Sequence, residues 1–191
     1  MKQRSRDAVD VLPTDAARAA WPVADALCEI LTRQADFIAA LDDSHYARPP
    51  AGQPSGIGAH VRHTLDHVQA LLRGRGRGWV DYDDRARGTD IERDRGAALR
   101  LTRRLCRQLA ELRGDDRAAI EVRALVCPAG PTVATPSSLA RELLFVLSHT
   151  VHHQAMMASA AHALGAAAPP RFGFAPATLA HLEQACAPSA S

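Results

Sequence analysis

The chain has 191 residues, which is enough for one compact domain with a sizeable core and short for two. Hydrophobic residues make up 47% of it and aromatic residues only 4%, a composition that suits packed helices better than a sandwich of strands. The net charge of +2, from 23 Lys and Arg against 21 Asp and Glu, gives no overall excess that would favour nucleic acid or an anionic membrane. We therefore expect one helical domain over residues 21–187, with no nucleic-acid partner and no membrane partner.

The two ends and the cysteines narrow the class of protein further. No apolar signal region follows the N-terminus, and no run of about 18 apolar residues occurs in the chain, so we expect a cytoplasmic protein. The four cysteines lie far apart and form no CxxC pair, which indicates neither a disulfide framework nor a thiolate zinc site. Residues 1–20 are polar and rich in alanine, and we expect weak order there.

The spacing of apolar residues predicts four long helices. The first opens at Pro22, a favoured first-turn residue, and runs to about residue 42, and the second spans about 56–73. The third covers about 91–113 with arginine-rich outer faces, and the fourth covers about 137–164, where Gly165 is well placed to end it. We interpret the arginine and glycine run at 73–78 as a solvated loop rather than a phosphate contact.

A short strand pattern precedes the fourth helix. Residues 120–126 partly alternate between apolar and polar, and residues 132–135 could pair with them across the turn at 128–131. We predict at most a small β-hairpin before the last long helix, and a short final helix over 178–185. The predicted fold class is all-α.

Six of the nine histidines fall in two short windows, residues 60–67 and 149–153. Residues four apart on a helix lie on one face with Cβ atoms roughly 6 Å apart, so two imidazoles at that spacing can bind one metal. The pairs His149 with His153 and His63 with His67 both have this spacing. His60 lies slightly nearer the apolar stripe than His63, so packing, support of a ligand and direct metal binding all stay open for it.

Glu142 shares a face of the fourth helix with the histidine pair, two turns away. Its carboxylate could act as a general base, orient a ligand or bind the metal. Three neutral nitrogen ligands without cysteine leave coordination positions for water or substrate, which is typical of a catalytic site. The pattern predicts one divalent ion, and zinc, nickel, iron and manganese all accept such ligands.

In this order and spacing, the motifs resemble the DinB/YfiT-like superfamily of metal-binding four-helix bundles. The resemblance spans about residues 22–185, and the segments 80–87 and 172–178 are similar to a less characterised branch of it. It implies an up-down four-helix bundle. Residues 55–63 are similar to the second-helix motif and residues 141–153 to the later helix. The resemblance thereby implies that one metal is bound by His63, His149 and His153. Helical spacing and position leave His60 and His67 as second choices.

Characterised members of this superfamily include metal-dependent transferases that attach low-molecular-weight thiols to electrophiles, and a thiol-dependent maleylpyruvate isomerase. By this resemblance the metal would lower the pKa of a thiol cosubstrate and present the thiolate to a small-molecule electrophile. Glu142 and Tyr82 are then the candidate catalytic residues, and Arg62, Asp83 and Arg85 the candidate substrate contacts. The arginine-rich third helix differs from the well-studied transferases and leaves the cosubstrate open.

Two alternative functions are compatible with the same motifs. A hydrolase that uses metal-bound hydroxide would need the metal site but no thiol. A non-catalytic metal-binding module of a stress response would need no substrate, and would act as a homodimer through its alanine-rich helix faces.

Overall fold

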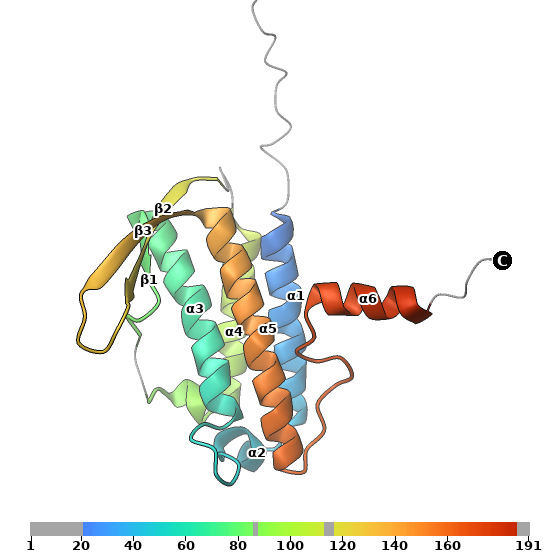
Figure 1. Cartoon of the computed structure of the whole chain (residues 1–191). Helices are drawn as coiled ribbons and strands as arrows, with labels where there is room; N and C mark the ends of the chain where they lie inside the picture. Colours follow the sequence, from blue (N-terminus) through green and yellow to red (C-terminus); the bar gives the residue numbers. More distant parts are fainter. Residues whose placement is uncertain (1–20, 86–87, 113–116, 187–191) are drawn as a thin grey trace, which may run out of the picture.

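The computed structural model describes residues 21–85, 88–112 and 117–186 (Figure 1). The described chain is mostly helical, as the composition predicts, and it also contains one small sheet. The weak order expected for residues 1–20 lies outside the described residues. Four long helices lie side by side: α1 (Pro22–Ala40), α3 (Ile57–Arg77), α4 (Arg95–Ala110) and α5 (Leu139–Ala163). Three short helical segments complete the helical part: α2 (Asp43–Ala47), the 3-10 turn η2 (Asp90–Glu92) and α6 (Pro176–Cys186).

The long helices have the starts and ends that their sequences favour. Pro22 occupies the first turn of α1, and the side chains of Asp94 and Ser138 accept backbone N–H groups at the starts of α4 and α5. The solvated loop predicted at 73–78 is wrong, because α3 continues to Arg77 and ends at Gly78 in the left-handed conformation. Gly74 lies inside this helix, and the absence of a side chain is needed there because a Cβ would lie 2.7 Å from the carbonyl oxygen of Trp79.

The helices α3 and α4 run in the same direction. The start of α3 packs against the backbone of Glu92, just before α4, whereas the carbonyl of Gly78 at its end accepts from the N–H of Glu121, shortly after α4. The segment 78–94 therefore carries the chain back along the length of α3. A strictly alternating up-down order does not describe this pair. Helices α1 and α3 each contact both α4 and α5.

The sheet has the order β1-β2-β3. Its strands are β1 (Trp79–Asp81), β2 (Ala119–Leu125) and β3 (Thr132–Ser138). The predicted hairpin is confirmed, since β2 and β3 pair antiparallel with Val122 opposite Thr135. The expectation of a hairpin at most is wrong, because β1 adds a parallel strand with Val80 opposite Val122. A three-residue strand whose partner lies about forty residues away has no local pattern by which to predict it.

The core lies between the four long helices and consists of the predicted apolar stripes. Leu27, Leu31 and Ile38 of α1 are buried together with Leu65 of α3 and Leu105 of α4. Burial of such side chains contributes about 1.5–3 kcal/mol each, which is the main stabilising term of a helical fold. Among the described residues, no helix is long and apolar enough to cross a bilayer.

Two cysteines also pack between the helices. The thiol of Cys28 on α1 donates to the carbonyl of Cys106 on α4 at 3.6 Å, and the thiol of Cys106 donates back to the carbonyl of Cys28 at 3.8 Å. Burial is the main cause that raises the pKa of Cys106 to about 12, so its thiol stays protonated.

Replacing Gly58 by alanine should destabilise the protein. A Cβ at this position would overlap the carbonyl of Glu92 and lie 3.0 Å from the ring of Tyr46. Because the obstacle is backbone, we expect the free energy of unfolding to fall by about 1–3 kcal/mol in urea titrations. Gly76→Ala in the same helix is the control, since nothing lies within 4 Å of its Cβ. It should leave stability unchanged or raise it by up to about 1 kcal/mol. Equal stabilities for the two variants would contradict this packing.

Candidate metal centre

Five histidines from two helices form one contiguous cluster. His60, His63 and His67 lie on α3, and His149 and His153 lie on α5, so the two sequence windows are brought together as predicted. His60, His67 and His153 are buried, whereas His63 and His149 are only half-buried. The cluster therefore meets solvent through the latter pair.

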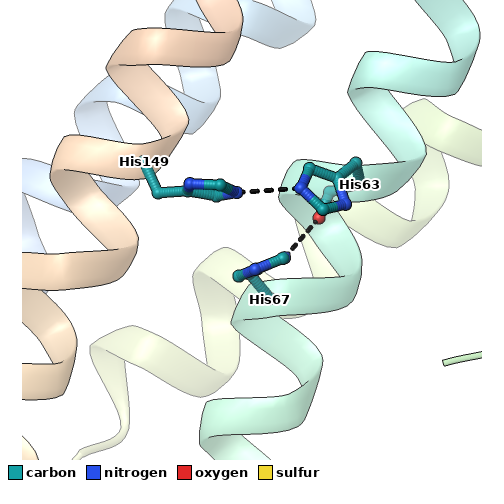
Figure 2. A group of neighbouring side chains, drawn as sticks. All are labelled: His63, His67 and His149. Carbon is teal, nitrogen blue, oxygen red and sulfur yellow. Dashed lines mark hydrogen bonds between the residues drawn. The ribbon is translucent and has the colours of Figure 1, made fainter. Parts of the chain in front are cut away.

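Three of these imidazoles converge as metal ligands do. One ring nitrogen of each of His63, His67 and His149 lies within 4.8 Å of the others (Figure 2). The Nε2 atoms of His63 and His149 are 2.9 Å apart. Two nitrogens that bind one ion at 2.0–2.1 Å in common geometries are separated by about 2.9–3.4 Å. The distance between these two nitrogens already fits a shared divalent ion.

His67 is held by its surroundings in one orientation. Its Nδ1 lies 2.9 Å from the carbonyl oxygen of His63, which can only accept, so Nδ1 carries the proton and Nε2 keeps its lone pair. The ring of Tyr82 stacks on it at 5.0 Å and 11°. Fixing the second nitrogen in this way is how proteins orient a histidine that binds metal.

His153, a predicted ligand, lies beside this group of three. Its ring centroid is 4.5 Å from that of His63 and 4.5 Å from that of His149. Its Nδ1 lies 3.1 Å from Nδ1 of His60, so these two rings share a hydrogen bond. His63 and His149 belong both to the predicted set and to the converging group, while the choice of His153 or His67 as third ligand stays a prediction.

Burial keeps all five imidazoles neutral. Removal from water is the first cause in each case, and neighbouring positive groups add to it. The pKa falls to about 2 for His63, about 4 for His149 and about 3 for His153, and it is also lowered for His60 and His67. Neutral imidazoles offer lone pairs, which is the form that binds metal.

Among the described residues, Glu142 forms no hydrogen bond with the histidine cluster and contacts Tyr82 instead. The carboxylate is fully buried and accepts from the hydroxyl of Tyr82 at 2.8 Å, from Ser137 at 2.6 Å and from Arg141 at 2.7 Å. Burial, and then the negative charge of Glu142, raises the pKa of Tyr82 and keeps its hydroxyl protonated. This geometry lets Glu142 orient Tyr82 against His67, and the catalytic roles of both residues stay predictions.

The three predicted substrate contacts lie in different places. Arg85 reaches the cluster, with its guanidinium against Nδ1 of His63. Asp83 instead accepts from the backbone N–H of Leu125 at 3.2 Å, which ties its loop to β2. Arg62 forms an ion pair with Asp66 at 2.7 Å and another with Glu92. Of the three, only Arg85 has a hydrogen-bond contact with a histidine of the cluster, whereas Asp83 acts on the pKa of His67 through its charge.

Phe145 is a residue of the site that the motifs did not single out. Its ring stacks on His149 with centroids 5.5 Å apart and also lies 5.2 Å from the ring of Tyr82. Phe145 precedes His149 by four residues on α5, so the helical spacing that paired His149 with His153 also indicates it. Together with Tyr82 it provides an apolar wall beside the half-buried candidate ligand His149.

Replacing Arg85 by glutamine should tighten metal binding. A guanidinium can only donate, so in the contact with Arg85 the Nδ1 of His63 accepts and Nε2 carries the proton. When a metal binds Nε2, the proton of the neutral ring must move to Nδ1. There it points at the guanidinium of Arg85, which has no lone pair to accept it. We expect Arg85→Gln to raise metal affinity roughly tenfold, because a positive charge is removed and the amide oxygen can accept. Competition with a chromophoric chelator measures this. The exposed Arg48→Gln is the control, and weaker binding by Arg85→Gln would contradict the argument.

One comparison places the chain in a family. A sequence model described as the DinB superfamily matches residues 27–157, from the first turns of α1 into the last turns of α5. The match therefore includes α3 and α4 whole, most of α1 and α5, and all five clustered histidines. No curated protein and no solved structure matches the chain. Because the family model covers more than half of the 191 residues, the chain belongs to the DinB superfamily.

Proposed function

We propose that this DinB protein is a metal-dependent enzyme that activates a low-molecular-weight thiol, for transfer to a small electrophile or for an isomerisation. The converging nitrogens of His63, His67 and His149 carry the proposal, since they offer three neutral donors at one half-exposed point. Packing of α1 and α3 against both α4 and α5 supports a four-helix bundle of DinB/YfiT type around this point.

The donor set fits one divalent ion. All three atoms are imidazole nitrogens, a set that suits zinc, nickel, iron or manganese. Three protein ligands leave at least one position for a small molecule. When bound there, the ion would supply Lewis acidity that lowers the pKa of a thiol, so that the thiolate forms near neutral pH.

The side chains around the ligands have separate roles in this proposal. Tyr82 and Phe145 wall the site with rings that contact His67 and His149, which limits access of water. Tyr82 keeps its hydroxyl proton and directs it to Glu142. Arg85, once it has left His63, provides a positive charge for an anionic group of the substrate.

The proposal is tested with purified, metal-loaded protein, monochlorobimane and a panel of low-molecular-weight thiols. Thiol transfer above the background rate is expected, and it should be lost in His149→Ala but kept in His152→Ala. His152 is a matched control because it neighbours the cluster yet is exposed. Absence of transfer with every thiol would contradict the proposed thiol transfer. Metal-dependent ester or amide hydrolysis would then favour a hydrolase, and the absence of both activities a non-catalytic module.

Replacing Tyr82 by phenylalanine tests whether its hydroxyl stabilises the fold or takes part in metal binding. The ring that stacks on His67 stays, but the buried carboxylate of Glu142 loses the donor at 2.8 Å. We expect a loss of about 1–3 kcal/mol in the free energy of unfolding, with metal affinity unchanged within a few-fold. Chemical denaturation and chelator competition measure the two effects. Loss of the metal in Tyr82→Phe would mean that the hydroxyl belongs to the metal site.

A further inference from the structure

The exposed face of α4 carries a stripe of arginines. Arg100, Arg103, Arg104 and Arg107 follow the spacing i, i+3, i+4 and i+7, so their side chains project from one side of the helix. The stripe is about 10 Å long at 1.5 Å per residue. It lies on the helix behind α3 and α5 in Figure 1, on residues that do not belong to the histidine cluster.

Among the residues that the structure describes, most of this positive charge has no carboxylate partner. Arg100 reaches Asp94 at 3.4 Å, whereas no carboxylate partner is described for the other three within the described part of the chain. The sequence of α4 from Arg95 to Ala110 contains no Asp or Glu. Like charges at these spacings destabilise a helix. In a chain whose net charge is only +2, these four arginines concentrate positive charge on one face of one helix.

The arginines surround a groove with an apolar floor. The groove has a volume of about 580 Å³, and Ile91, Ala97 and Leu101 line it together with the four arginines. A second groove of about 250 Å³ continues on the other side of Arg104, towards Arg73 and Leu72 of α3. The volume of the first groove is typical of small-molecule sites, which have volumes of about 300–1,000 Å³.

We propose that this groove binds a small amphiphilic polyanion, a molecule with two or more phosphate or carboxylate groups joined to an apolar part. Guanidinium groups bind such anions in a bidentate manner, and the floor formed by Ile91 and Leu101 accepts the apolar part. The site is separate from the proposed metal centre and does not depend on it.

Other anionic partners fit the groove less well. No aromatic side chain lines it, so the bases of a single-stranded nucleic acid would have nothing to stack on. A helix that inserts into a membrane, or the core of a stable protein interface, would add exposed large apolar side chains to this charge. The exposed large apolar residues of the described chain all lie outside α4: Leu125, Val126, Val133, Leu144, Met156 and Phe174.

Calorimetric titration of the full chain with geranyl diphosphate and with inorganic pyrophosphate tests the proposal. We expect one molecule of geranyl diphosphate to bind per chain, at least about tenfold more tightly than pyrophosphate, because its apolar part adds burial. Arg104→Gln with Arg107→Gln should weaken this binding at least about tenfold, since glutamine keeps the helix but removes both charges. The double variant Arg33→Gln with Arg48→Gln loses the same amount of charge away from the groove. It should bind geranyl diphosphate as tightly as the unmodified chain does.

The outcomes separate this groove from other sites. His149→Ala should bind geranyl diphosphate as the unmodified chain does, because the proposed metal centre takes no part. Equal binding by the two double variants, or no binding of either compound, would overturn the proposal. Binding of oligo(dT) that is lost in Arg104→Gln with Arg107→Gln, without binding of geranyl diphosphate, would overturn it in favour of a nucleic-acid surface.

Discussion

Replacing His149 by alanine is expected to abolish stoichiometric metal binding. His149 supplies the nitrogen 2.9 Å from Nε2 of His63, and these two histidines are the ones on which geometry and family resemblance agree. Loss of a residue that merely supports a ligand costs 10–100-fold in affinity, so loss of a ligand should cost about 100-fold or more. Metal content after dialysis and competition with a chromophoric chelator measure the effect.

Two further variants identify the third ligand. His67→Ala removes a member of the converging group, and His153→Ala removes the ligand expected from the family resemblance. The variant that loses about 100-fold in affinity identifies the ligand, whereas removal of a supporting residue should cost less. His152→Ala, next to the cluster but exposed, should bind metal normally. Stoichiometric metal in both His149→Ala and His63→Ala would contradict the centre.

Acid should destabilise the metal-free protein over a window set by the clustered histidines. Burial lowers the pKa to about 4 for His149, about 3 for His153 and about 2 for His63, below the 6.5 of an exposed histidine. Between pH 6.5 and these lower pKa values, the unfolded chain binds protons that the folded chain does not. The free energy of unfolding therefore falls as the pH falls. Each histidine contributes at most about 1.4 kcal/mol per pH unit. Urea titrations from pH 7 to about pH 4 measure this decline.

A variant tests whether the cluster causes this decline. His63→Gln with His149→Gln removes two of the groups, so its stability should depend less steeply on pH than that of the unmodified chain. An equal dependence would place the acid-sensitive groups elsewhere. Protons also compete with metal for the same nitrogens, so the bound ion should be released in the same acidic range.

The local parts of the fold could be predicted from the sequence, and the long-range parts could not. Helical spacing predicted the four long helices, and the pairs His63 with His67 and His149 with His153 predicted which faces meet. The direction of α4 depended on the segment 78–94, whose short strand β1 is stabilised only by pairing with β2. No periodicity within three residues predicts such a contact.

The same difference applies to the residues around the histidines. The predictions grouped Glu142 with the ligands because both lie on one face of α5, yet Ser137, Arg141 and Tyr82 occupy its oxygens. Tyr82 and Arg85 belong to the loop after β1, so their contacts with His67 and His63 depend on the course of the chain after α3. A helical wheel places residues on a helix, but it does not place a loop.

Anomalous diffraction from crystals of the metal-loaded protein tests the central claim most directly. We expect one divalent ion per chain at about 2.0–2.1 Å from Nε2 of both His63 and His149, with a third nitrogen from His67 or His153. An ion bound by neither His63 nor His149, or no ion after loading with zinc, nickel, iron and manganese in turn, would contradict the metal centre.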